Sequence, residues 1–457
     1  MDYGYHAWML VAASLVIMMT TPALALFYGG MSRSKSVLNM MMMSFGTMGI
    51  AAIIYVLWGW SMSFGPSDVG MLFANPFSLF GLDGVSGQDY IFVGFQLTFA
   101  VITAALISGA VADRMKFSAW MLFVPLWLTL SYFPIAHMVW GGGFLGTAEN
   151  GLAALLFDGD PLPIDYAGGT VVHINAGVAG LVLAVMLGKR IGFLKEPMRP
   201  HNLTLTMIGA GLLWLGWYGF NVGSIVFGGS SPEADAEQFL SETSLVWLNT
   251  TVATAAAILG WLAVEKVRHG KATSLGAASG VVAGLVAITP ACGALSPVGS
   301  IILGLVAGAL CALAVGLKYR FGYDDALDVV GVHLVGGLVG TIGAGFLATS
   351  TGLFYGGGAS QLVLQVLVAL IAMLWSGVAT VIVALIVKAV IGLRVDEEDE
   401  IDGIDFAEHG ESAYEIGPGS ARRTVMVGSA SGSSGSSGSS GAPGSTTESK
   451  ENEGANA

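Results

Sequence analysis

Long apolar segments alternate with short polar loops along most of the chain. A membrane-spanning helix needs about 20 mainly apolar residues, and the sequence contains eleven segments that approach or exceed this length. We therefore predict eleven transmembrane helices, at residues 6–30, 37–64, 91–111, 118–140, 166–188, 202–228, 244–266, 273–290, 297–318, 326–348 and 361–393.

The basic residues of the chain lie on one side of this predicted membrane. All 18 Lys and Arg residues are at the ends of odd-numbered segments, in the loops that follow them, or in the C-terminal tail. The other loops carry acidic residues such as Asp68, Glu149 and Glu233, and no Lys or Arg. Because cytoplasmic loops are rich in Lys and Arg, we predict an N-terminus outside the cell membrane and a cytoplasmic C-terminus.

The composition agrees with an all-α polytopic membrane protein. Charged residues make up only 11% of the chain, against about 25% in soluble domains. The net charge of −13 comes mainly from loops and tail, and such an acidic surface argues against nucleic acid as a partner. Cys292 and Cys311 have no metal-type spacing, so we interpret both as packing residues.

Three regions are expected along the chain. Residues 1–393 form the transmembrane transport domain. Residues 394–425 are polar but retain apolar residues such as Phe406, which favours a cytoplasmic regulatory tail that docks on the domain. Residues 426–457 combine a Gly/Ser-rich linker with a charged end, a composition typical of disordered chain.

Two of the segments contain related sequences. DYAGGTVVHINAGVAG begins at Asp165, and DALDVVGVHLVGGLVG begins at Asp325. Aligned on histidine, they match at five pairs: Asp165/Asp325, Val172/Val332, His173/His333, Gly177/Gly337 and Gly180/Gly340. Segments five and ten cross the membrane in opposite directions, which predicts a five-helix inverted repeat, segments 1–5 and 6–10, with the solute path at the interface of its halves.

His173 and His333 are therefore candidate pore residues. Ionisable side chains at membrane depth are costly, which makes each a functional hypothesis; the alternative is a pair of satisfied core histidines. Two histidines without a carboxylate or thiol are a poor metal site, and we expect no metal or cofactor. Two neutral imidazoles can face each other, one donating and one accepting.

Several longer stretches resemble the ammonium transporter (Amt/Mep/Rh) family. The resemblance covers residues 4–416, and its tail is similar to that of the prokaryotic Amt branch. The matching stretches are FYGGMSRSKSVLN, ALISGAVADRMKFSAWMLF, YFPIAHMVWGGG, DYAGGTVVHINAGVAGL, WLGWYGFNVGS, DVVGVHLVGG and GLRVDEEDEIDGIDFAEHGESAY. The loop between Trp140 and Asp165 is longer than in compact family members.

The resemblance assigns a role to each candidate site residue. It implies that His173 and His333 are the paired pore histidines and that Phe99 and Phe220 close the outer pore. It further implies an outer recruitment site at Trp140 and Ser224, a pore-lining Trp217 and a buried Asp165 near that site. Without the family, Phe99 and Phe220 would be core residues, Trp140 an interfacial aromatic residue and Asp165 a helix cap.

These residue types suit ammonium. An aromatic face attracts the cation by about 0.5–2 kcal/mol, but an apolar pore penalises any ion by several kcal/mol or more. Shifting an amine-like pKa from about 10 to neutrality takes about 4 kcal/mol, and desolvation shifts buried lysines by about that much. We therefore expect ammonium to be deprotonated inside the phenylalanine gate and conducted as ammonia.

Other functional classes fit less well. The sequence has no paired NPA motifs, no TVGYG filter, no HExxH, no GxSxG with triad partners and no P-loop, so a water channel, a potassium channel and an enzyme are disfavoured. The main alternative is an ammonium sensor that signals through its tail. The resemblance also implies a homotrimer in the plasma membrane, a PII-type regulator at the cytoplasmic face, and methylammonium as a transported analogue.

The topology is testable by labelling. A cysteine introduced at Gly87 should react with an impermeant reagent applied to intact cells, and one at Ser412 should react only after permeabilisation. The opposite labelling pattern would show that the orientation is wrong.

Overall fold

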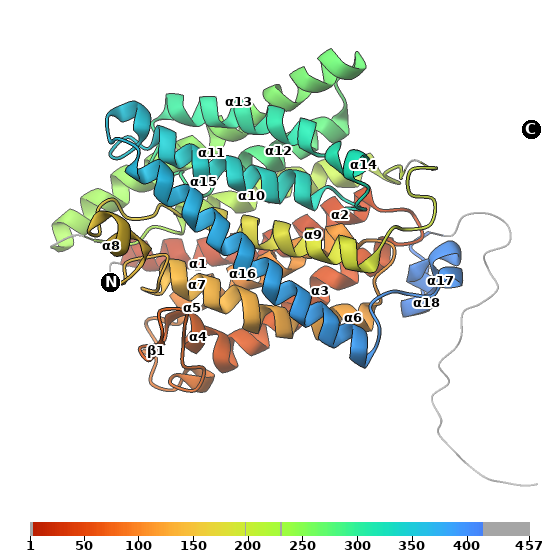
Figure 1. Ribbon diagram of the computed structural model, residues 1–457, viewed down its shortest axis with the longest axis horizontal. Helices are drawn as coiled ribbons and strands as arrows, with labels where there is room; N and C mark the ends of the chain where they lie inside the picture. Colours follow the sequence, from red (N-terminus) through yellow and green to blue (C-terminus); the bar gives the residue numbers. More distant parts are fainter. Residues whose placement is uncertain (1–2, 197, 229–230, 415–457) are drawn as a thin grey trace, which may run out of the picture. The chain divides into compact units, whose positions relative to one another are not determined.

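The computed structural model describes residues 3–196, 198–228 and 231–414. In these residues the chain is helical apart from loops and one small antiparallel hairpin (Figure 1). The hairpin joins β1 (Asp68–Val69) to β2 (Phe73–Ala74), with Asp68 opposite Ala74 and Val69 opposite Phe73.

The first half of the fold contains five spans: three are interrupted by a π-helical turn, one ends in a 3₁₀ turn and one begins with a π-helical turn. The first two spans are α1 (Tyr3–Met18), a π-helical turn (Met19–Leu24) and α2 (Ala25–Met31), then α3 (Val37–Ile54), a π-helical turn (Tyr55–Gly59) and α4 (Trp60–Phe64). The third span is α5 (Tyr90–Ile107) with a 3₁₀ end (Ser108–Val111), and the fourth is α6 (Phe117–Trp127), a π-helical turn (Leu128–Tyr132) and α7 (Phe133–Trp140). After the short α8 (Leu152–Phe157), the fifth span is a π-helical turn (Gly169–Ile174) that leads into α9 (Asn175–Leu187).

The second half of the fold begins with α10 and is described in chain order. Its helices are α10 (Leu203–Val222), α11 (Pro232–His269), α12 (Ser274–Ile288), α13 (Pro297–Ala314), α14 (Leu317–Phe321), a π-helical turn (Val330–Leu334) with α15 (Val335–Leu347), α16 (Ser360–Val390), and the two tail helices α17 (Glu397–Asp402) and α18 (Ile404–His409). Two 3₁₀ turns lie in loops, at Phe80–Leu82 and Leu353–Tyr355.

Ten of these spans are long and apolar enough to cross a membrane, within the part of the chain that the structure describes. The eighth predicted segment, 273–290, corresponds to α12, whose 15 residues are fewer than a full crossing needs. The multi-pass membrane fold is therefore confirmed, while the count of eleven crossings and their orientation stay predictions.

One predicted boundary is wrong by a large margin. The apolar pattern places the seventh helix at 244–266, but α11 starts at Pro232 and has 38 residues. Local capping explains the extension, because the Ser231 side chain accepts from the Ala234 N–H and acidic residues occupy the first turn. Hydrophobicity alone marks where a helix meets lipid, and this helix continues beyond that point.

The two related sequences cross each other in the middle of the fold. When the chain is followed by its colours in Figure 1, α9 and α15 run in opposite directions. Each of these helices packs against the π-helical turn that precedes the other. The matched glycines lie at this crossing. A Cβ on Gly177 would be 2.5 Å from the Leu334 backbone N, and one on Gly337 would be 3.2 Å from the Gly169 carbonyl O. Small residues thus let the two backbones touch.

The second matched pair of glycines repeats this relation. A Cβ on Gly180 would lie 3.1 Å from the Ala110 side chain, at the end of the third span. A Cβ on Gly340 would lie 2.1 Å from the carbonyl O of Ala287, at the end of the eighth predicted span. Equivalent helices of the two halves therefore approach their glycines in the same way, which is the relation expected of a repeat.

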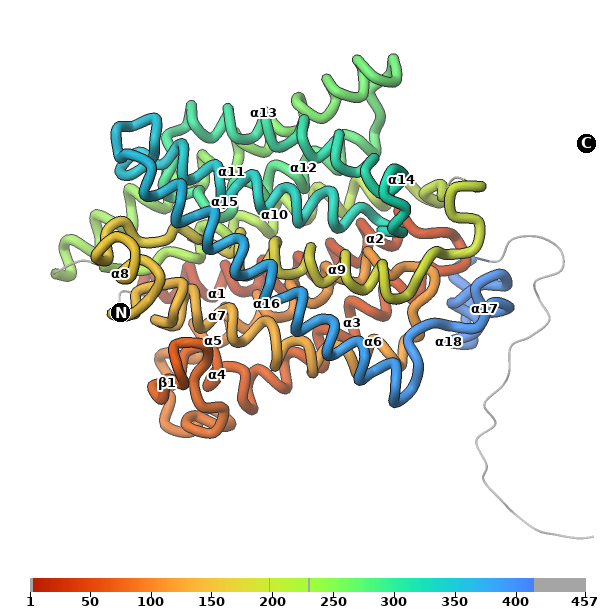
Figure 2. Tube along the Cα trace, viewed as in Figure 1, coloured from red at the N-terminus to blue at the C-terminus, as the bar shows by residue number. Residues whose placement is uncertain are grey.

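The tail folds back on the helix ends that carry the basic loops. Asp405 accepts hydrogen bonds from the N–H groups of Leu38 and Asn39, at 3.0 and 2.7 Å, in the first turn of α3. Glu408 accepts from the N–H of Phe117, the first residue of α6, at 3.1 Å. The tube view in Figure 2 follows α17 and α18 from the end of α16 to this position. The tail thus caps two helices far from it in sequence.

Candidate functional site

His173 and His333 face each other at the crossing. Their Nδ1 atoms are 3.3 Å apart, their rings are nearly parallel, at 21°, and both side chains are buried. Each lies on a π-helical turn, and the His173 N–H donates to the Gly168 carbonyl five residues earlier, at 3.1 Å. Only one proton fits between the two Nδ1 atoms, so the geometry suits two neutral imidazoles, one donating and one accepting.

A narrow cavity borders the histidine pair. The centre of a water-sized sphere can occupy about 10 Å³ inside this cavity. The cavity therefore has room for about one water-sized molecule. The Nε2 atom of His173 is buried without a hydrogen-bond partner in the protein. The remaining lining is apolar or aromatic: Met19, Leu24, Phe27, Ile102, Leu106, Val172, Leu213, Trp217, Phe220 and Val282.

Phe220 lines this cavity, and its ring stacks on that of Phe99. The rings of Phe99 and Phe220 are 4.0 Å apart at 11°, and Phe220 lies 6.3 Å from the His173 ring. Trp217 stacks on His173 at 5.5 Å and donates its Nε1–H to Thr289 Oγ1 at 2.9 Å. The structure therefore brings these predicted residues into one column of rings.

Trp140 and Ser224 lie next to the phenylalanines. The Trp140 ring meets Phe99 edge-on, at 5.8 Å and 83°, and its Nε1–H donates to the Asp165 carbonyl at 2.8 Å. Ser224 is one helical turn beyond Phe220 and donates its hydroxyl to the Phe220 carbonyl at 2.8 Å. Both side chains are partly exposed, so they can meet a solute before it reaches the cavity.

Asp165 acts as a helix cap. Its carboxylate accepts four backbone hydrogen bonds, from Gly168, Gly169, Thr170 and Val171, at 2.6 to 3.2 Å. Burial raises the pKa of this carboxyl to about 6, and the four N–H donors oppose the rise. The helix-cap role of Asp165 thus accounts for the contacts of its carboxylate, while its backbone carbonyl orients the Trp140 side chain.

Asp325 makes the equivalent contacts in the other half. Its carboxylate accepts from the N–H groups of Val329 and Val330, at 3.0 and 2.8 Å, where the π-helical turn bearing His333 begins. Each histidine is therefore carried by a buried helix start that an aspartate caps, an arrangement that the alignment suggested but did not explain.

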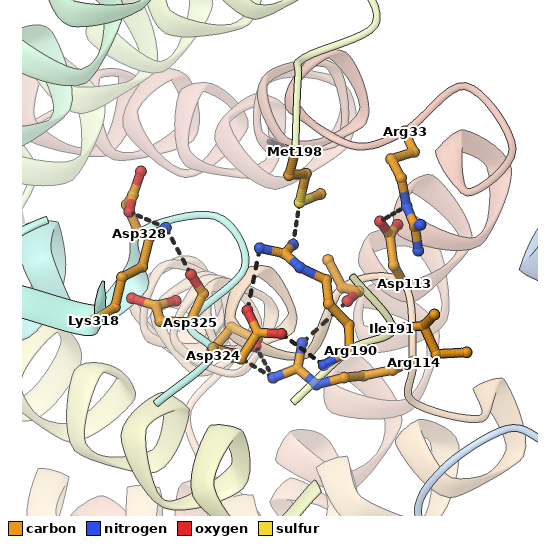
Figure 3. Close-up of polar contacts among 12 residues, drawn as sticks. Arg33, Asp113, Arg114, Arg190, Ile191, Met198, Lys318, Asp324, Asp325 and Asp328 are labelled. Carbon is orange, nitrogen blue, oxygen red and sulfur yellow. Dashed lines mark hydrogen bonds and ion pairs between the residues drawn. The ribbon is translucent and has the colours of Figure 1, made fainter. Parts of the chain in front are cut away.

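Sequence reasoning missed a second group of buried charges, drawn in Figure 3. Arg114 is completely buried and donates to the carbonyls of Ala110, Ala112, Gly188 and Asp324. Burial lowers the pKa of this guanidinium to about 10, so it remains charged at neutral pH. The sequence did not indicate that these charged residues are buried, because they lie in polar loops that become buried only when the loops fold over one another.

The other members of this group are paired. Arg33 binds Asp113 at 2.5 Å, Arg190 binds Asp324 at 3.1 Å, and Lys318 binds Asp328 at 2.6 Å. These pairs join loops at the predicted cytoplasmic end and do not line the cavity. We interpret them as structural. Among the described residues, no group of three or more His, Cys, Asp or Glu side chains could hold a metal ion.

The chain is similar to known proteins over most of its length. A family model described as the Ammonium Transporter Family matches residues 7–414. An ammonium transporter of Mycobacterium tuberculosis is 51% identical over 451 residues, which cover 91% of each chain.

Solved structures show the same likeness. Candida albicans Mep2 is 32% identical with a TM-score of 0.76, covering 87% of this chain and 88% of that one. A protein described as Sensor Amt Protein is 27% identical with a TM-score of 0.77, covering 89% of this chain and 98% of its own.

The capping role of Asp165 is testable by thermal melting in detergent. Asp165→Asn should destabilise the fold by about 1–3 kcal/mol, because an amide NH₂ replaces one oxygen and meets backbone N–H donors. Asp158→Asn is the matched control, since Asp158 is exposed and left-handed backbone suits asparagine equally. Equal melting temperatures for wild type and Asp165→Asn would refute the role.

Proposed function

The chain belongs to the ammonium transporter family, and on that basis we propose that it captures ammonium at an outer aromatic site, deprotonates it and conducts ammonia past the paired histidines. One observation carries the proposal: a cavity with room for about one water-sized molecule is lined by His173, His333 and Phe220, and the Phe220 ring stacks on Phe99. Such a cavity fits a molecule of the size of ammonia.

Capture relies on the aromatic residues above the stack. Trp140 is held by the Asp165 carbonyl and keeps part of its ring exposed. A cation on an aromatic face gains about 0.5–2 kcal/mol, and the Ser224 hydroxyl oxygen still has a lone pair to accept an N–H from ammonium. A cation thus finds favourable contacts at the mouth that a neutral solute of this size lacks.

Deprotonation follows from the lining of the cavity. None of its lining side chains is acidic, so an ammonium ion there would have no counter-charge and would pay the full desolvation penalty. Ammonia pays far less and can use the histidine nitrogens, including the unpartnered Nε2 of His173. The site thereby favours the neutral form: ammonium gives its proton to water at the partly exposed mouth and enters as ammonia, whereas potassium, which has no proton to lose, is rejected.

We also propose that residues 394–425 regulate transport. The described part of this tail caps α3 through Asp405 and α6 through Glu408, so its docking stabilises helix ends of the transport domain. Residues 415–425 and the predicted disordered region 426–457 lie outside the described residues. The homotrimer and a PII-type regulator at this face are part of the proposal on the strength of the family alone.

The pore assignment is testable in proteoliposomes with methylammonium as substrate. His173→Ala or His333→Ala should lower flux by about tenfold or more, or abolish discrimination against potassium, because the remaining imidazole loses a partner worth about 1–3 kcal/mol. His269→Ala is the matched control, since His269 is exposed at the end of α11.

Wild-type flux also decides between transporter and sensor. A pure sensor would bind substrate without moving it in liposomes that lack any partner. If wild type conducts and both histidine variants conduct equally well with unchanged selectivity, the pore assignment is wrong.

The regulatory tail is testable by truncation and by one substitution. Deleting residues 394–425 should lower transport at matched membrane levels, and deleting 426–457 should leave it nearly unchanged. Asp405→Asn should weaken docking, because its amide NH₂ meets the N–H groups of α3. Glu411→Gln, at an exposed position of the tail, is the control. Identical flux from every one of these proteins would exclude regulation by the tail.

A further inference from the structure

Two buried glutamines of α16 hold the loop that leads into Asp165. Gln361 and Gln365 are one helical turn apart, and both have no exposed surface. Gln365 Oε1 accepts from the N–H of Ile164 at 2.8 Å, and its Nε2 donates to the carbonyl of the same residue, also at 2.8 Å. One side-chain amide thus satisfies both backbone groups of Ile164.

The loop needs this support because of its own sequence. Residues 161 to 164 read Pro-Leu-Pro-Ile, and proline has no N–H to donate. Gln361 adds a second contact by donating to the Leu162 carbonyl at 3.1 Å, while its own Oε1 accepts from Thr351 at 2.7 Å. The loop therefore has its backbone satisfied by side chains of a distant helix and not by regular structure.

The position of Ile164 determines the position of Trp140 at the proposed outer site. The next residue, Asp165, orients Trp140 through its carbonyl and starts the helix of His173 through its carboxylate. Gln365 also donates to the Thr341 carbonyl at 3.1 Å, and Thr341 belongs to α15, the helix that follows His333. The amide therefore ties the loop of one half to the pore helix of the other.

We propose that Gln365 is a positioning residue that sets the affinity of the outer site for its cation. Gln365 is not among the residues that line the cavity and acts through Ile164, Asp165 and Trp140. This inference rests on the proposed function, because it assumes that Trp140 meets the substrate. Loss of the amide lets the Asp165 carbonyl and Trp140 shift, so capture weakens. The four N–H groups that bind the Asp165 carboxylate still hold the start of the His173 helix, so the pore below keeps its geometry.

The test separates half-saturation concentration from maximal flux. Gln365→Met keeps the side-chain length and removes all four side-chain hydrogen bonds, including the one that Gln365 Oε1 accepts from Gln361 Nε2 at 3.3 Å. It should raise the half-saturation concentration for methylammonium by about tenfold while maximal flux per folded protein stays near that of wild type. Thr380→Val is the matched control, since Thr380 is buried on the same helix and bonds Trp127 at 2.9 Å, away from the mouth. The control should melt at a lower temperature with an unchanged half-saturation concentration.

Gln365→Glu provides a second readout. A protonated carboxyl can accept from the Ile164 N–H and donate to its carbonyl, whereas a carboxylate would repel the carbonyls of Ile164 and Thr341. The ratio of half-saturation concentrations, variant over wild type at the same pH, should be near one at low pH and rise as pH is raised. If Gln365→Met cannot be recovered folded, this ratio decides, and a ratio independent of pH overturns the proposal.

The outcomes distinguish this inference from the function beneath it. Absence of methylammonium flux in wild type would refute the proposed function itself. Wild-type flux with an unchanged half-saturation concentration in folded Gln365→Met would leave the function standing and refute the positioning role.

Discussion

The close contact of α9 and of α15 with the π-helical turn that precedes the other helix is the constraint on which the site depends. Gly177 and Gly337 allow this approach, because a Cβ at either position would meet the opposing chain within about 3 Å. At that separation, imidazoles on the two preceding turns come within hydrogen-bonding distance. The histidine pair is thus a product of two glycines and of the π-helical turns that set the direction of each ring.

The starts of the two helices that carry the histidines create a second requirement. The first N–H groups of such helices have no intrahelical partner, and lipid offers none. Asp165 and Asp325 meet this need at the crossing. The same solution recurs where Asp405 and Glu408 of the tail cap α3 and α6. Carboxylates placed at helix starts therefore hold together both the helices that carry the histidine pair and the docked tail.

Much of this could be predicted from the sequence, for identifiable reasons. Apolar length gives the spans because lipid contact requires it, and the Asp, His and Gly spacing revealed the repeat because the same crossing needs those residues twice. The start of α11 was missed because Ser231 and Pro232 act locally and carry no hydrophobic signal. Gln365 and Arg114 were missed because their partners are backbone groups far away in sequence, which only the folded chain brings near.

The ring contact above the cavity has a consequence for the energy balance of the cell. The rings of Phe99 and Phe220, with centroids 4.0 Å apart, leave no gap for water between them. Under the proposed function, each passage requires the rings to part and close again, one molecule at a time. Ammonia would then enter without a standing water-filled path through which other ions could leak.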